Sequence, residues 1–333
     1  MSDSPITDNP PVRFDDVSFF YSQMDSGDGP TMDPGQEQEM PRAVENPAEV
    51  TQVFGGITVD LPPGVMSLVG QNGIGKSTLL LLAGGRLFPT SGTVKILGKD
   101  TRDFEQAPYQ PELEEERNRY ASFIYQNMEF ETEDSIGNLM DFVYQNGYHA
   151  EKSSDRLVQI QEALELRELL DKKTQELAKG ELQRTIIAFS LLYGSKLILM
   201  DEPVFAMEDF RKEQVFEFLM DFAQREQVSI YYSAHDLDLT KKYSDYMMLF
   251  WKKGDIQLGP TEELFTRENI EKAYQVPFDM LYRKEYLFRT MLMKMSGAAA
   301  GFEDADDQSA GEESESSEDP DSHTGEGDGN GSG

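Results

Sequence analysis

Short apolar runs, separated by longer stretches with helical spacing, mark the chain from residue 12 to about residue 250. Apolar and polar positions alternate in the first of these runs, which predicts a strand with one buried face. The later runs are almost wholly apolar, which is typical of strands buried on both faces of a parallel sheet. The predicted strands are Val12–Tyr21, Val50–Leu61, Val65–Val69, Thr93–Leu97, Lys196–Met200, Val228–Tyr232 and Met247–Phe250.

Helical stretches lie between these strands. A helix is expected to begin after Gly75 and to include the leucine block 79–82. From Glu131 to about Leu182 the sequence reads as largely helical, with apolar residues at the spacing of one helix face. Strands that alternate with helices predict an α/β fold with a parallel sheet.

Two segments are too poor in apolar residues to form a packed core. Residues 22–49 are rich in Asp, Glu, Gly, Pro and Gln and predict an acidic, mobile insertion. Residues 297–333 predict a disordered acidic tail, preceded by a C-terminal extension at 277–296. The longest apolar run, 185–200, is too short and too interrupted to span a bilayer, and no secretory leader is apparent. Any membrane role is therefore expected to come through a partner.

The charge balance argues against nucleic acid as a partner. The 333 residues carry a net charge of −32, of which residues 302–333 contribute twelve acidic residues and no lysine or arginine. A nucleic-acid-binding protein would need a basic patch. The excess acid on the remaining chain fits either adaptation to high salt or a soluble surface. The chain has no cysteine, so disulfides and thiolate metal sites are excluded.

The strongest chemical signal is a glycine-rich segment of the form GxxxxGK[ST], placed between a predicted strand and a predicted helix. Its backbone N–H groups can cradle phosphate oxygens, and the helix N-terminus adds a favourable dipole. Lys76 is expected to reach the β- and γ-phosphates of a nucleotide, and Ser77 to coordinate Mg²⁺. The expected nucleotide-binding residues are Gly70, Gln71, Asn72, Gly73, Ile74, Gly75, Lys76, Ser77 and Thr78.

A second signal is the apolar strand that ends in two carboxylates, Asp201 and Glu202. Asp201 at the strand end is expected to hold Mg²⁺, directly or through water, and Glu202 to polarise the attacking water. Taken alone, the pattern also fits an ordinary strand end. Its pairing with the phosphate-binding segment favours a catalytic role.

These two motifs and the segments around them resemble the ABC ATPase family over about residues 12–276. The resemblance assigns Tyr21 to stacking on adenine, with a packed core aromatic as the alternative. It assigns Gln126 to joining the two lobes and sensing Mg²⁺ and γ-phosphate, and His235 to contacting the γ-phosphate. Gln126, His235 and Glu202 are thus the expected catalytic residues, and Ser77, Gln126 and Asp201 the expected metal ligands.

The family signature, LSGGQ followed by Gln-Arg, appears in altered form as Leu177–Arg184. The serine is replaced by Ala178, a glycine by Lys179 and the glutamine by Glu181, whereas Gly180 is retained. The resemblance implies that these four residues cap the γ-phosphate bound to a second subunit. Glu208 stands where the family usually has aspartate.

The resemblance implies a P-loop NTPase with a RecA-like core, an antiparallel β subdomain and a helical subdomain inserted at 127–182. It implies ATP and Mg²⁺ as cofactors, a second identical or different ATPase subunit, and transmembrane permease subunits that hold the chain at the cytoplasmic face of the cell membrane. The segment 259–276 is similar to ATPases of iron-chelate, haem and cobalamin importers. Two alternatives remain, a soluble ABC-type ATPase without a permease and a subunit that binds ATP without turnover.

Overall fold

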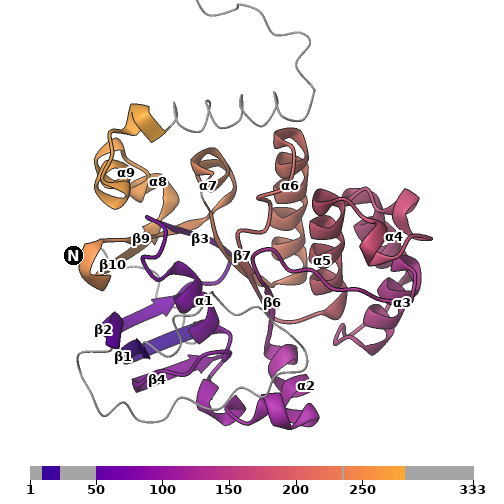
Figure 1. Cartoon of the computed structure of the whole chain (residues 1–333), viewed down its shortest axis with the longest axis horizontal. Coiled ribbons are helices and arrows are strands. Elements are labelled where there is room, and N and C mark those ends of the chain that lie inside the picture. The colour runs from indigo at the N-terminus through magenta and orange to yellow at the C-terminus, as the bar shows by residue number, and fades with distance from the viewer. Residues whose placement is uncertain (1–9, 23–49, 235, 282–333) are drawn as a thin grey trace, which may run out of the picture. The chain divides into compact units, whose positions relative to one another are not determined.

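The computed structural model describes residues 10–22, 50–234 and 236–281, and those up to Phe278 form one compact unit. His235, nearly all of the expected acidic insertion and the expected tail lie outside the described residues. Figure 1 shows two sheets, with helix α1 (Lys76–Ala83) between them. Of the two sheets, α1 contacts β4 in one and β7 and β8 in the other.

The smaller sheet is antiparallel along all its pairs, in the order β2-β1-β4-β5. Its strands are β1 (Val12–Ser22), β2 (Val50–Leu61), β4 (Ser91–Ile96) and β5 (Lys99–Asp100). Along β1, Val12 and Phe14 are buried while Arg13 and Asp15 are exposed, which is the period of two that predicts a half-buried strand. The expected antiparallel β subdomain is therefore confirmed.

The larger sheet has the order β10-β9-β3-β8-β7-β6, and every pair in it is parallel except β10 with β9. Its strands are β3 (Val65–Val69), β6 (Ala121–Ile124), β7 (Leu197–Asp201), β8 (Ser229–Ser233), β9 (Tyr246–Phe250) and β10 (Ile256–Pro260). Every residue of β3, β7 and β8 is buried, as the apolar runs predicted. The parallel sheet is thus confirmed, with an antiparallel edge strand that the sequence pattern did not reveal.

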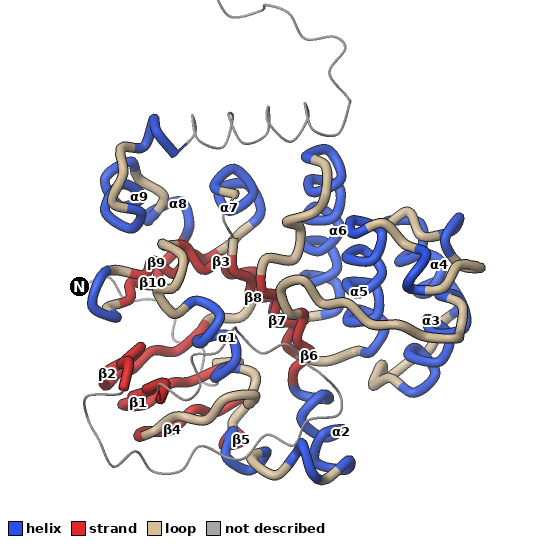
Figure 2. The backbone as a smooth tube through the Cα atoms, viewed as in Figure 1, coloured by secondary structure: helices blue, strands red, loops and turns tan. Residues whose placement is uncertain are grey.

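Helices cover both faces of this sheet, as the tube in Figure 2 makes plain. Besides α1, the helices are α2 (Pro111–Tyr120), α3 (Ile136–Asn146), α4 (Ser154–Ala163), α5 (Lys179–Tyr193), α6 (Asp209–Glu226), α7 (Leu237–Tyr243), α8 (Thr261–Leu264) and α9 (Arg267–Tyr274). Of these, α3 and α4 pack on α5 and lie beyond it from the sheet. The stretch 131–182 is helical only in part, because its helices α3 and α4 are short and start at the serine caps Ser135 and Ser153.

Two hydrophobic cores lie on opposite sides of the larger sheet. Ile198 and Met200 of β7 belong to the core shared with α3–α6, whereas Leu197 and Leu199 belong to the core shared with α1 and the smaller sheet. Successive strand residues point to opposite faces. A strand that lies between two cores must therefore be apolar on both faces. In β7 the first polar residue is Asp201, at the carboxyl end of the strand.

Candidate functional site

The glycine-rich segment forms the tight loop between β3 and α1. Gly70, Gly73 and Gly75 adopt positive φ values of 157°, 73° and 114°. Residues with a Cβ atom adopt this region only at a steric cost, whereas glycine does so readily. A Cβ on Gly75 would lie 2.8 Å from Cγ1 of Val53 in β2, and one on Gly70 would lie 3.0 Å from Cβ of Phe250 in β9. The backbone of the loop therefore packs against β2 of the smaller sheet and β9 of the larger sheet, and this packing fixes its shape.

Lys76 begins α1 and folds back over the loop. Its Nζ donates to the carbonyl oxygen of Gly70 at 2.8 Å and to that of Gln71 at 2.9 Å. The residue is only 6% exposed. Burial lowers the pKa of its ammonium, and the nearby carboxylates of Glu202 and Asp201 oppose that shift. A buried cation at a glycine-rich loop that leads into a helix N-terminus is the arrangement that favours an anionic phosphate.

The two carboxylates stand at the carboxyl end of β7, next to the end of β8. Ser233, the last residue of β8, donates its hydroxyl to Asp201 Oδ1 at 2.5 Å and accepts from the N–H of Glu202 at 3.0 Å. Glu202 itself adopts φ 49°, which turns its side chain out of the strand. One serine thus fixes the carboxylate of Asp201 and the backbone of Glu202, a role that was not predicted from the sequence. The signal that could have found it is its position at the end of the neighbouring parallel strand.

Gln126 follows β6 by two residues and reaches the same place. Its Nε2 donates to Oε2 of Glu202 at 2.7 Å, across 76 residues of sequence. Asn127 takes φ 53°, so the chain turns sharply as soon as Gln126 has passed the site. Gln126 and Glu202, which were predicted separately, are therefore brought into direct contact.

Tyr21 lies at the end of β1 that is nearest to the phosphate loop. Its hydroxyl is 3.1 Å from the hydroxyl of Thr78 in α1, and its ring meets Phe19 edge-on at 4.9 Å between centroids. The ring is half-buried. The structure thus places Tyr21 beside the loop, as expected of a residue that would flank a bound base.

The altered signature forms the N-terminus of α5, where Ala178 is the cap residue. The carboxylate of Glu181 accepts from the N–H of Ala178 at 2.8 Å, so the side chain that replaces the family glutamine stabilises the first turn of its own helix. A Cβ on Gly180 would lie 3.0 Å from the carbonyl oxygen of Ala206, and Gln183 accepts from the Ala206 N–H at 3.1 Å. The segment therefore packs on the loop that follows Glu202.

Lys179 and Glu208, the other altered positions, lie at the surface. Lys179 Nζ is 3.8 Å from a carboxylate oxygen of Glu129, with exposed side-chain fractions of 77% and 63%. Glu208 precedes α6 with its side chain 85% exposed and a guanidinium nitrogen of Arg211 at 3.7 Å. Both charged groups are therefore placed for contact with solvent or with another chain.

A further contact reaches the loop from the far end of the chain. Gln71 donates its side-chain amide to the carbonyl oxygen of Tyr274, the last residue of α9, at 2.5 Å. Gln71 was expected to bind the nucleotide as part of the phosphate loop. The sequence carries no local signal of this contact, since 203 residues separate the partners.

The donor set suits Mg²⁺ when a nucleotide is bound. Asp201 is 9% exposed and has one oxygen fixed by Ser233, and Ser77 lies exposed in the first turn of α1. Gln126 engages Glu202 through its amide nitrogen, so its oxygen is the atom left for a cation. A carboxylate, a hydroxyl and an amide oxygen are hard ligands of the kind Mg²⁺ takes alongside phosphate oxygens.

The fold and this site define a class, the P-loop ATPases whose core is joined to an antiparallel β subdomain and a helical subdomain. The family model described as ABC transporter matches residues 54–205. The chain belongs to this family, as an ATP-binding subunit of the kind that couples ATP hydrolysis to transport. Among the described residues, no helix is long and apolar enough to cross a membrane.

Two curated relatives and two solved structures illustrate the match. The chain is 30% identical to the lipoprotein-releasing system ATP-binding protein LolD of Xanthomonas campestris pv. campestris over 194 residues, 58% of this chain and 80% of that protein. It is 29% identical to the molybdenum import ATP-binding protein ModC of Paramagnetospirillum magneticum over 205 residues, which span 61% of this chain and 54% of that protein.

Both structures share the fold at low sequence identity. The dimeric ATP-binding cassette MJ0796 in a post-hydrolysis state with ADP and Pi superposes with a TM-score of 0.58 and 19% identity, covering 75% of this chain and 98% of that one. The inward-facing conformation of a metal-chelate type ABC transporter superposes with a TM-score of 0.55 and 21% sequence identity. The match covers 81% of this chain and 90% of that one.

Proposed function

We propose that this chain is the ATP-hydrolysing motor of a membrane transporter, acting as one half of a two-subunit clamp that drives separate permease subunits. The observation that carries the proposal is the convergence of three segments on one place. The loop at Lys76, the end of β7 at Asp201 and Glu202, and the turn after β6 at Gln126 are joined by direct hydrogen bonds or charge interactions.

The roles of the residues follow from these contacts. Lys76 holds the β- and γ-phosphates by exchanging its bonds to the loop carbonyls for bonds to phosphate oxygens. Glu202 accepts a proton from the water that attacks the γ-phosphate, and Gln126 holds that carboxylate in place. His235, expected to contact the γ-phosphate, follows β8 two residues beyond Ser233, which bonds the Asp201 carboxylate and the backbone N–H of Glu202.

Tyr21, Ser77 and Asp201 complete the proposed site. Tyr21 would flank the adenine, with its hydroxyl fixed by Thr78. Ser77, Asp201 and Gln126 would hold Mg²⁺, which on binding neutralises negative charge on the phosphates. Asp201 keeps one carboxylate oxygen for that purpose because Ser233 occupies the other.

The signature residues Ala178, Lys179, Gly180 and Glu181 would act on the nucleotide of the second subunit. They start α5, whose N-terminal dipole attracts a phosphate. The surface position of Lys179 fits a contact made in trans. The family's members dimerise and pair with membrane permeases, and this chain would lie at the cytoplasmic face of the membrane through such partners.

We infer import as the direction, with an iron chelate, haem or cobalamin as cargo. The inference rests on the segment 259–276, which here forms β10, α8 and α9. The relatives named above act on molybdenum and on lipoproteins, so likeness over the catalytic core does not select a cargo. Reconstitution with a permease that co-purifies with the chain, with ATPase rate measured against each chelate, tests the cargo directly.

The motor assignment is tested by two substitutions with opposite effects. Lys76→Ala removes the buried cation, so ATP binding should be lost. Glu202→Gln keeps the shape and loses the base, so ATP should bind while the hydrolysis rate falls by about 10²–10⁴-fold. Nucleotide titration and phosphate release measure both. The exposed Lys95→Ala and Glu217→Gln serve as controls, and hydrolysis at the parental rate by Glu202→Gln would contradict the proposed base.

The second candidate function is a soluble ABC-type ATPase that has no permease. Extraction of the chain from membranes in detergent separates the two. A polytopic protein that co-purifies in a fixed ratio supports the transporter, whereas a chain found only free of membranes supports the alternative.

A further inference from the structure

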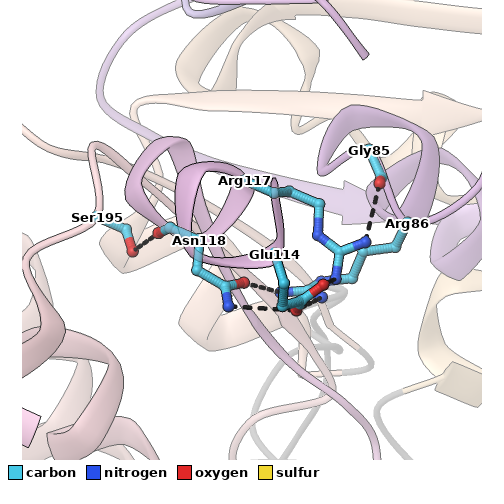
Figure 3. A network of polar contacts seen from close by, with 6 residues as sticks. All are labelled: Gly85, Arg86, Glu114, Arg117, Asn118 and Ser195. Carbon is cyan, nitrogen blue, oxygen red and sulfur yellow. Dashed lines mark hydrogen bonds and ion pairs between the residues drawn. The ribbon is translucent and has the colours of Figure 1, made fainter. Parts of the chain in front are cut away.

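A cluster of charged side chains lies away from the nucleotide site, between the end of α1 and helix α2. Glu114 of α2 accepts from Arg117 and lies 3.6 Å from a guanidinium nitrogen of Arg86. Arg86 also donates to the side-chain oxygen of Asn118 at 2.9 Å, and Arg117 to the carbonyl oxygen of Gly85 at 3.3 Å. Figure 3 shows the side chains of Arg86 and Arg117 meeting at the carboxylate of Glu114.

The cluster is buried and carries more positive than negative charge. The side chains of Arg86 and Arg117 are 12% and 7% exposed, and they share the single carboxylate of Glu114. Burial and the neighbouring charge of Arg86 lower the pKa of Arg117. The excess charge is met by aromatic rings, because the guanidinium carbon of Arg86 lies 5.8 Å from the ring centroid of Phe123 and 5.9 Å from that of Tyr125. Such contacts gain strength when water is excluded.

The segments that meet at this cluster each lead to one part of the nucleotide site. Arg86 follows α1, which begins at the phosphate loop. Arg117 precedes β6, which leads to Gln126. Ser195 donates to the carbonyl oxygen of Asn118 at 2.6 Å. It lies in the short connection between α5, which begins at the signature, and β7, which ends at Asp201.

Gln126 depends on this support because it has little packing of its own. It is exposed, and the next residue already turns into the left-handed region. Its position is therefore set by its bond to Glu202 on one side and by the half-buried Tyr125 on the other. The ring of Tyr125 contacts both Phe123, at 4.5 Å between centroids, and the guanidinium of Arg86, at 5.9 Å.

We propose that Arg86 is a positioning residue for hydrolysis, which acts through Tyr125 to hold Gln126 against Glu202. The proposal rests on the role of Gln126 given under the proposed function. It assigns no contact between Arg86 and the nucleotide. Loss of the guanidinium should therefore lower the turnover rate and leave the affinity for ATP unchanged.

The primary test is Arg86→Met, which keeps side-chain length and removes the charge. We expect kcat for ATP hydrolysis to fall by about tenfold with KM for ATP within about twofold of the parent, because a small displacement of a positioning group acts on the reaction step. Arg86→Lys retains a cation over the rings and should recover part of kcat. Tyr125→Leu removes the ring and should match Arg86→Met, which gives an independent measurement should Arg86→Met fold poorly.

A double-mutant cycle with Gln126→Ala separates positioning from general destabilisation. If Arg86 acts through Gln126, then Arg86→Met should change kcat by less than about twofold once Gln126 is alanine. The control is Arg119→Met, on helix α2, whose guanidinium lies 5.5 Å from the ring of Tyr148 instead. This control should leave kcat unchanged.

The outcomes are distinct. A tenfold loss from Arg86→Met that persists in the Gln126→Ala background would overturn the inference and leave the proposed function intact. An unchanged kcat for Arg86→Met and Tyr125→Leu would do the same. Parental kcat in Gln126→Ala alone would overturn both the role of Gln126 and the positioning role of Arg86.

Discussion

The phosphate loop and the altered signature, both proposed to bind phosphate, are held in place by different kinds of interaction. In the loop, the residues are fixed by backbone conformation and burial: three glycines take φ values from 73° to 157°, and Lys76 is 6% exposed. In the signature, the start of the helix is held by a side chain, since the Glu181 carboxylate accepts from the N–H of the cap residue Ala178. The neighbouring Lys179 side chain is 77% exposed. A site built from packed backbone tolerates almost no substitution, whereas a site built at an exposed helix start can change residues and keep its geometry.

The largest effect should come from adding a methyl group to the loop. Gly75→Ala would place a Cβ 2.8 Å from Val53 at φ 114°, so the loop must change shape. We expect ATP affinity to fall by about 100-fold or more, as measured by nucleotide titration, since strained positions cost about 1–3 kcal/mol before any clash is added.

Gly73 provides the matched control for this substitution. It takes φ 73°, but an added Cβ would have nothing within 4 Å. Gly73→Ala should therefore show the conformational cost alone, about 1–2 kcal/mol. Equal losses for the two variants would mean that packing against β2 does not fix the loop.

The next effect concerns the hydroxyl donor that the signature lacks. If two identical copies form the clamp, Ala178→Ser restores one donor to each γ-phosphate, and the ATPase rate should rise by roughly tenfold, from a charged hydrogen bond of about 1.5–3 kcal/mol. If the natural partner is a different subunit, mixing with that partner should raise the rate more than Ala178→Ser does.

Lys179→Gly is measured beside it, since the ammonium is free to leave an exposed pair with Glu129. Loss of activity in Lys179→Gly, with no change in Ala178→Ser, would show that the lysine has taken over the donor role. The signature would then donate to the γ-phosphate through an ammonium in place of a hydroxyl, with no loss of ATPase activity.

A smaller effect is expected from the cap itself. Glu181→Ala removes the acceptor for the Ala178 N–H and an ion pair with Lys172 at 3.7 Å. The unfolding free energy, from urea titration, should drop by about 1 kcal/mol. Glu181→Gln keeps an acceptor and should lose less. A loss of the same size in both variants would point to charge, not to the hydrogen bond, as the source of the stabilisation.

The smallest effect is expected at Lys179 in the same urea titration. Lys179→Ala breaks only the exposed contact with Glu129, so the unfolding free energy should stay within about 0.5 kcal/mol of the parent. A larger loss would show that the exposed start of α5 is held more firmly than its solvent exposure implies.

The parts of the fold that were predictable are those encoded locally. The strands β2 and β3 were predicted with their observed bounds, and β7 and β8 within a residue. The fully buried strands β3, β7 and β8 stand out as short, mostly apolar runs, whereas β2 is only partly buried and was found from its strand-like residues. The edge strand β10 and the charged helix α2 were missed, since neither carries an apolar period: Ile256–Pro260 contains a glycine and a proline, and Pro111–Tyr120 is mostly charged.

The candidate site divides in the same way. The phosphate loop and the two carboxylates are contiguous motifs and were found from sequence. Ser233, Arg86 and the contact from Gln71 were not, because each acts on a residue at least 31 positions away and is of a type common on any surface. The roles of Tyr21 and of the signature residues stay predictions that only bound nucleotide can test.

The contact between Gln71 and Tyr274 sets how short a working version of this protein can be. The match to the family model ends at residue 205, but the side chain of Gln71 donates to a carbonyl oxygen near the end of the described chain. The last carbonyls of a helix need donors from elsewhere, and here the phosphate loop provides one to α9. A deletion that removes Tyr274 would therefore take away a support of the phosphate loop, whereas one that begins after Phe278 would keep it.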